Sequence, residues 1–361
     1  MNLERVVDNR TPMAHWCAVV TDRHGHDVIL VIAKMTWTVS ATGNVTIASP
    51  QSPVRLDDEP ISDTPNSSIR YPSDLYEEKA GTDVLLVGSA EPPPGRRVSE
   101  MEVGLRIAAS HRSIQKVVKV YGPRVFQKGM VGIVPGPAAE LRSTAIVYEN
   151  TYGGTDMTEP GRPVSEPRNP VGRGFAKNRA ALVGQPAPPI EDPRAPLSSK
   201  NPAPACFGAV RGEWAQRLQY AGTYDDSWRR KRAPLRPVDF DPRFYHLAPP
   251  DLWTDVPLAG DEPVEVTGTS AAPVWRFRLP RYAPLFSISV SGSKQEPKAH
   301  LDTYLIDTDE RKVEVTFRAT APMPRKLEHI DKVLIMGAQS LPEALIEELA
   351  ERVRARRSVV S

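Results

Sequence analysis

Proline is concentrated in the middle of this chain, and that placement restricts the fold more than any other feature. Residues 150–263 hold 18 of the 37 prolines in under a third of the 361-residue length. Proline fixes φ and lacks a backbone donor, so helix interiors and central strands rarely tolerate it. Glycine, asparagine and aspartate alternate there with single aromatic residues. We therefore expect an ordered region of rigid turns, and ordered loops of this length usually carry a function.

Strand patterns lie on both sides of this region. Short β-branched or alternating runs occur before it at 17–20, 28–39, 84–88, 101–107, 115–121 and 143–148, and after it at 263–268, 275–279, 285–290, 299–306, 312–319 and 331–336. Such spacing is typical of antiparallel sheets. We predict a mainly β protein, an antiparallel sandwich or two packed β lobes with long Pro/Gly-rich loop insertions. Its regions are 1–149 (β), 150–263 (ordered loops) and 264–361 (β plus a terminal helix).

Few helices are expected. Residues 211–220 and 226–231 could form short ones. A C-terminal helix after Ser340 has Leu345, Leu349 and Val353 four residues apart on one stripe, which favours packing on a sheet edge or binding a partner.

Composition excludes several classes of protein. The net charge of +2 and the 40% hydrophobic content argue against a nucleic-acid surface and against disorder. No apolar run approaches the ~20 residues of a membrane span. Cys17 and Cys206 lack the spacing of a disulfide framework or a zinc site. We expect a soluble cytoplasmic protein with reduced thiols, no metal and no cofactor.

Motifs for catalysis are weak. Neither a phosphate-binding loop nor a nucleophile elbow is present. The run His24-Gly25-His26-Asp27 could hold a metal, but in a tight hairpin these residues are more typical of a turn. Cys206 and His246 could form a nucleophile–base pair, although no sequence feature orients either one.

Acidic residues of the loop region leave two interpretations open. Asp225, Asp239 and Asp241 could hydrolyse a carbohydrate or peptidoglycan as paired carboxylates, with nearby tryptophans stacking on sugars. Aspartate beside glycine or proline more often caps a turn. The basic run 229–232 indicates a solvated face or a partner for these acids.

An ordered series of short motifs runs along the chain and begins with Lys34-Met35-Thr36-Trp37, residues 79–83 and Gly88-Ser89-Ala90. It continues through Tyr152, Gly153, Gly154, Asn169, Pro170, Gly172, Gly174, Gly222, Thr223, Tyr224, Asp225, Asp239, Phe240, Asp241, Arg243 and Phe244. In this series the chain resembles the DUF2169 family across most of residues 5–290, and the resemblance implies one continuous domain.

This resemblance implies an accessory protein of bacterial type VI secretion. Such a protein would act as an adaptor or chaperone that binds a toxic effector and helps to load it on the spike protein of the secretion tip. The family offers no catalytic residue to transfer. An exported structural component of the tip is a further alternative.

Five residues of the loop region are candidate partner contacts because aromatic residues and arginine dominate binding energy at interfaces. They are Trp214, Arg217, Tyr224, Trp228 and Trp253. The alternative is that these side chains anchor loops on the sheets. The oligomeric state is not indicated.

Overall fold

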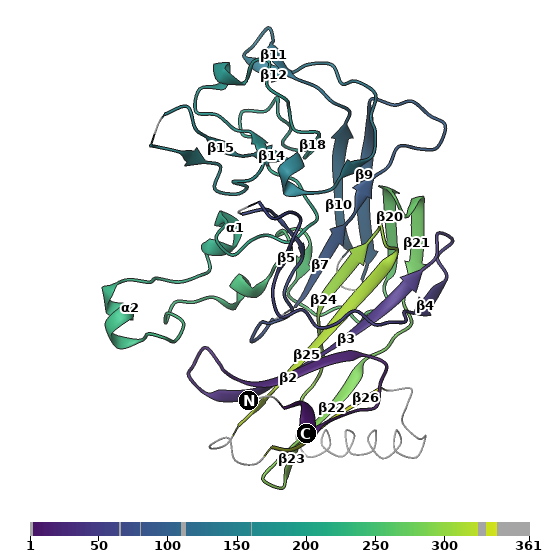
Figure 1. Ribbon diagram of the computed structural model, residues 1–361, viewed down its shortest axis with the longest axis vertical. Coiled ribbons are helices and arrows are strands. Elements are labelled where there is room, and N and C mark those ends of the chain that lie inside the picture. Colours follow the sequence, from purple (N-terminus) through teal and green to yellow (C-terminus); the bar gives the residue numbers. More distant parts are fainter. Residues whose placement is uncertain are drawn as a thin grey trace.

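The computed structural model describes residues 3–64, 66–79, 81–109, 113–159, 161–323 and 330–337. Over these residues the chain is mainly β, with two short α-helices (Figure 1). Side chains from three larger sheets meet in one apolar cluster. The prediction of a mainly β fold with long loop insertions is confirmed.

The central sheet has the order β19-β7-β24-β25-β3-β2, and β4 also pairs with β3. Its strands are β2 (Ala14–Thr21), β3 (Asp27–Val39), β4 (Val45–Ile47), β7 (Thr82–Val87), β19 (Trp253–Thr254), β24 (His300–Asp307) and β25 (Lys312–Pro322). β7 and β24 run parallel, whereas the other pairs are antiparallel. Strands from the first and last thirds of the chain therefore form a single sheet.

The second sheet has the order β13-β8-β20-β9-β10-β18, with β21 paired to β20. It contains β8 (Ser89–Ala90), β9 (Glu100–Ala108), β10 (Ser113–Tyr121), β13 (Thr144–Ala145), β18 (Ile190–Glu191), β20 (Pro263–Thr269) and β21 (Ala272–Arg278). The third sheet, β1-β26-β22-β23, contains β1 (Val7–Asn9), β22 (Pro284–Val290), β23 (Ser293–Gln295) and β26 (Ile330–Gly337).

The remaining elements are short. Two-stranded sheets pair β5 (Glu59–Pro60) with β6 (Ile69–Tyr71), β11 (Phe126–Lys128) with β12 (Ile133–Pro135), β14 (Tyr152–Gly153) with β17 (Arg173–Gly174), and β15 (Thr155–Asp156) with β16 (Val164–Ser165). The α-helices are α1 (Ala215–Leu218) and α2 (Asp226–Lys231). Single 3-10 turns are η1 (Glu4–Val6), η2 (Tyr148–Asn150), η3 (Arg179–Leu182) and η4 (Pro242–Tyr245).

β3 shows how the sequence builds the core. Side chains alternate between the two faces of a strand, so every second residue points the same way. The apolar series Ile29, Val31, Ala33, Met35, Trp37 and Val39 joins the shared cluster, which also receives side chains from the other two sheets. One face of the central sheet is therefore apolar.

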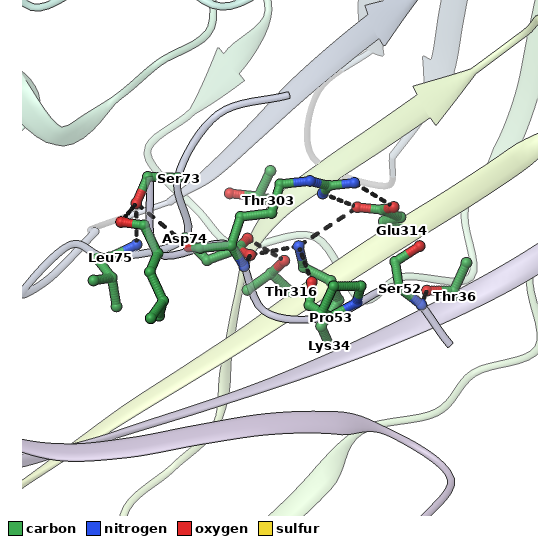
Figure 2. A network of polar contacts seen from close by, with 12 residues as sticks. Lys34, Thr36, Ser52, Pro53, Ser73, Asp74, Leu75, Thr303, Glu314 and Thr316 are labelled. Atoms are coloured by element: carbon green, nitrogen blue, oxygen red, sulfur yellow. Dashed lines mark hydrogen bonds and ion pairs between the residues drawn. The ribbon is translucent and has the colours of Figure 1, made fainter. Parts of the chain in front are cut away.

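The opposite face of this sheet carries a buried network of charged side chains. Lys34 on β3 and Glu314 on β25 are 1% and 5% exposed, and their charged groups lie 3.5 Å apart (Figure 2). Asp74 pairs with Lys34, and Arg55 pairs with Glu314. Arg55 and Asp74 come from the turn-rich segment between β4 and β7. A buried charge is costly unless it is paired, so this network fixes the segment over the sheet.

Most of the predicted strands are confirmed, with one departure. The predicted run 143–148 is a strand only at Thr144–Ala145, because the chain then turns into η2. The turn buries the ring of Tyr148. Helices at 215–218 and 226–231 match the two predicted inside the loop region, the first in a shorter form. The predicted terminal helix lies outside the described residues.

Within the described ranges, no helix has the length and apolar character needed to cross a bilayer. The predicted cytoplasmic location stays a prediction.

Glu314→Gln should destabilise the fold. Burial alone would raise the pKa of Glu314, but its hydrogen bond from Arg55 and the charges of Lys34 and Arg55 lower the pKa from 4.5 to about 2. Loss of one partner of a buried pair costs about 3 kcal/mol or more. Urea unfolding at pH 7 measures this cost.

The same substitution gives a pH test. A carboxylate with a lowered pKa stabilises the fold above its unfolded pKa, and this stabilisation is lost as the pH falls through the folded value. The difference in the free energy of unfolding between wild type and Glu314→Gln should therefore become smaller as the pH falls below 5. Glu310→Gln, at an exposed carboxylate of the adjacent turn, should change stability by less than about 0.5 kcal/mol at any pH. If the difference in unfolding free energy between wild type and Glu314→Gln were the same at every pH, Glu314 would not be a charged member of the buried network.

Candidate functional site

The loop region is held together by buried polar side chains bonded to backbone groups. Asn169 is 0% exposed, and its Nδ2 donates to the carbonyl oxygens of Tyr148 and Tyr152, each at 2.9 Å. It also donates to Thr151 Oγ1 at 2.9 Å, while the Asn169 carbonyl accepts from Gly154 N. One family-motif residue therefore joins η2, β14 and the turn before β17.

Motif glycines permit this close packing. Gly153 has φ +150°, and a Cβ there would lie 2.1 Å from the carbonyl oxygen of Asn169. A Cβ at Gly172 would lie 2.4 Å from Asn169 Nδ2. Both distances are too short for any side chain. These glycines shape the loop, as does Gly174, where a Cβ would lie 3.1 Å from Pro188.

Asp83 on β7 fastens another part of the loop region to the central sheet. Its carboxylate accepts from Lys79 Nζ at 2.8 Å and from Leu247 N at 2.7 Å, and it lies 2.7 Å from His246 Nδ1. Burial would raise the pKa of Asp83, but the charges of Lys79 and His246 hold it well below its usual range. The ring of His246 stacks on Trp253 at 4.2 Å. Trp253 is therefore a half-buried anchor at the sheet edge.

Two more partner-binding candidates lie in the interior. Trp214 is 1% exposed and packs edge-on against Tyr148, with ring centroids 4.8 Å apart. Arg217 donates to the carbonyl oxygens of Val210 and Phe244 and lies over the Phe244 ring. Both side chains are buried and hold loop segments in place, whereas their role as partner contacts stays a prediction. Aromatic and arginine side chains serve both roles, so residue type alone did not distinguish them.

The other two candidates lie on a projection. We call residues 219–241 the α2 arm, which extends away from the sheets at the left of Figure 1. Tyr224 is 48% exposed, and its ring meets the half-buried Trp228 edge-on at 4.6 Å. The arm thus presents aromatic side chains to solvent.

The arm is braced internally by motif residues. Asp225 caps α2 by accepting from Trp228 N at 2.7 Å. Asp239 accepts from Thr223 N at 3.0 Å and from Thr223 Oγ1 at 2.8 Å. Trp228 Nε1 donates to the carbonyl oxygen of Leu235 at 2.9 Å. These bonds tie the two limbs of the arm together.

A groove of about 550 Å³ runs along the arm. Trp228, Pro237 and Val238 contribute apolar surface, and Val238 is 87% exposed. The remaining lining residues are polar or charged: Thr223, Asp225, Ser227, Lys231, Arg232 and Asp239. Sequence reasoning missed Val238 and Lys231, since nothing in a single valine or a basic run shows that it borders a groove.

Motif residues at the base of the arm have structural contacts. Gly222 has φ +78°, and a Cβ there would lie 2.9 Å from Pro237. Phe240 is buried, and its ring lies 5.7 Å from that of Phe244. Asp241 caps η4 by accepting from Arg243 N at 2.9 Å.

Hydrogen bonds stabilise the charged forms of Asp239 and Asp241. Backbone and side-chain hydrogen bonds from Thr223 lower the pKa of Asp239, and the hydrogen bond from Arg243 lowers that of Asp241. A glycosidase needs one carboxyl group with a raised pKa as general acid. Asp225 and Asp241 cap α2 and η4, whereas Asp239 accepts from Thr223 on the opposite limb of the arm.

The other candidate catalytic and metal-binding residues also have structural hydrogen-bond partners. Cys206 Sγ donates weakly to the carbonyl oxygen of Ile146, whereas His246 Nδ1 is engaged by Asp83. His24 and His26 lie in the β2–β3 turn, where both backbone amides donate to Asp22. The described part of the chain contains no group of three or more His, Cys, Asp or Glu that could hold a metal ion.

Asn169→Ala should lower the free energy of unfolding by about 2–3 kcal/mol, because it removes three hydrogen bonds at a fully buried position, to Tyr148 O, Thr151 Oγ1 and Tyr152 O. Denaturant unfolding measures the loss. Asn150→Ala is a matched control, because the Asn150 side chain makes only exposed hydrogen bonds, from Nδ2 to Ala145 O and from Arg173 to Oδ1, and its loss should cost less than about 1 kcal/mol. Equal losses would contradict the role given to Asn169.

Both thiols should resist alkylation in the folded protein. Burial raises the pKa of Cys206 to about 11 and that of Cys17 to about 12, and the thiolate is the reactive form. Iodoacetamide at pH 8, followed by mass spectrometry, should label both residues only after unfolding. Rapid labelling of native Cys206 would revive the thiol-enzyme interpretation.

Comparisons with known proteins agree with the motif resemblance. Neither a curated protein nor a solved structure matches this chain. One family model matches residues 24–318, and its description is "uncharacterized protein conserved in bacteria". Because this match covers most of the chain, the protein belongs to the DUF2169 family.

Proposed function

We propose that this protein is a non-catalytic adaptor that holds another polypeptide on the α2 arm. The single observation that carries the proposal is the combination of a braced backbone with exposed apolar side chains on one projection. Trp228 and Val238 line a groove there, and the exposed Tyr224 packs edge-on against Trp228. A rigid loop loses little conformational entropy on binding, and aromatic side chains supply much of the binding energy.

The finer identity of the partner follows from the motif resemblance. We propose a toxic effector of bacterial type VI secretion as the bound polypeptide and the spike protein as the acceptor. The occupied aspartates and the buried thiol favour this binding role over hydrolysis. A chaperone of this kind stays in the cytoplasm, whereas recovery of the protein from culture medium would favour an exported tip component.

The test is co-purification of the effector encoded by the adjacent gene with tagged variants of this protein. Tyr224→Ala and Val238→Asp should each reduce the recovered effector at least tenfold, since both side chains are exposed and contribute little to folding. Trp228→Ala should abolish recovery, although it also removes the bond to Leu235.

The control is a pair of exposed apolar residues elsewhere. Met130 and Val131 lie between β11 and β12 and are fully or nearly fully exposed. Met130→Ser with Val131→Ser should leave recovery unchanged. Wild-type recovery with both Tyr224→Ala and Val238→Asp would refute the docking role of the arm.

A further inference from the structure

The end of α2 carries positive charge that the protein itself leaves unneutralised. Residues 229–232 are Arg-Arg-Lys-Arg. Within the described ranges, only Arg229 of these four pairs with a carboxylate, that of Asp226 at 2.6 Å. Arg230 and Arg232 donate to carbonyl oxygens, which satisfies their hydrogen bonds without cancelling their charge. Lys231 is exposed and lines the groove.

The acidic residues of the groove do not offset this charge at close range. Asp225 accepts a hydrogen bond at the N-terminal end of α2, and Asp239 accepts hydrogen bonds from the amide and hydroxyl of Thr223. Lys231 and Arg232 line the groove from the last turn of the helix and the residue after it. The groove is thus acidic at one end of α2 and basic at the other, with Trp228 and Val238 as apolar lining.

We infer that the groove binds a segment of the partner protein in which an apolar side chain is followed or preceded by carboxylates. The apolar side chain lies against Trp228 and Val238, and the carboxylates face Lys231 and Arg232 at the basic end of α2. This inference rests on the proposed function and specifies the chemistry of the bound segment. Complementary charge suppresses wrong partners and fixes orientation, while the apolar contact supplies affinity.

A nucleic acid is the other anionic ligand that a basic run suggests. The groove disfavours it, because Asp225, Asp226 and Asp239 lie around the same short helix and would repel a continuous polyanion. The chain as a whole carries a net charge of only +2. A protein segment can place neutral or basic residues opposite these aspartates, whereas a phosphate backbone cannot.

The experiment follows the indole ¹H–¹⁵N signal of Trp228 in the full chain by NMR, with the signal assigned from Trp228→Phe. The probes are the peptide Ser-Gly-Leu-Phe-Glu-Asp, its basic counterpart Ser-Gly-Leu-Phe-Arg-Lys, and a six-nucleotide single-stranded DNA. The acidic peptide should shift the signal saturably. The basic peptide and the DNA should bind at least tenfold more weakly.

Charge reversal supplies the matched comparison. The double variant Arg230→Glu with Lys231→Glu should lower the affinity for the acidic peptide at least tenfold at low salt. It should raise the affinity for the basic peptide. Arg96→Glu with Arg97→Glu reverses two adjacent exposed arginines elsewhere and should change neither affinity. Equal binding of both peptides, tighter binding of DNA, no saturable shift, or an equal effect of the two double variants would overturn the inference.

Effector co-purification separates this inference from the proposed function. If Tyr224→Ala abolishes effector recovery while the acidic peptide fails to bind, the adaptor role stands and the assigned segment chemistry is wrong. If effector recovery is insensitive to the arm while the peptide binds as expected, the groove chemistry stands and the adaptor role is wrong.

Discussion

Hydrogen bonds from buried polar side chains to backbone groups are the interaction on which this structure depends. The proline-rich middle cannot satisfy its amides and carbonyls in helices or long strands, and buried groups without partners are costly. Asn169 supplies donors to two such carbonyls, and Asp83 accepts from the amide of Leu247. Regular secondary structure is thus replaced by specific side chains, which explains why the family motifs are short and scattered.

The central sheet gives these loops a fixed support. Its apolar face joins the shared core, whereas its other face bears Lys34 and Glu314 and binds the segment that carries Arg55 and Asp74. The Lys79–Asp83 pair then connects this face to the loop at His246. Two buried ionic clusters therefore hold irregular segments on a rigid sheet, and the α2 arm extends from this assembly.

Much of the fold could be predicted from the sequence, because strand periodicity is a local property. β25 was evident from its alternating apolar residues and β3 from its long β-branched and aromatic run. The ion pair between Lys34 and Glu314 was not, because it depends on the register of two strands far apart in the chain. Alternation of polar residues also does not reveal whether a polar face is wet or, as in β3, covered by another segment.

The candidate site was predicted only in part, for a related reason. Residue type singled out five aromatic or arginine side chains, but exposure depends on tertiary packing. Trp214 and Arg217 became anchors, whereas Tyr224 reached the surface. The exposure of Val238 could not be predicted from the sequence, because it depends on the conformation of the turn that carries this residue.

The most direct test of this account is amide hydrogen exchange across the α2 arm of the free protein, measured by NMR. The account predicts that the amides of Thr223, Trp228 and Phe240, each hydrogen-bonded in the structure, exchange about a hundredfold or more slowly than in an unstructured peptide. Exchange of all three at the unstructured rate would show that no preformed docking surface exists, and would contradict the central claim.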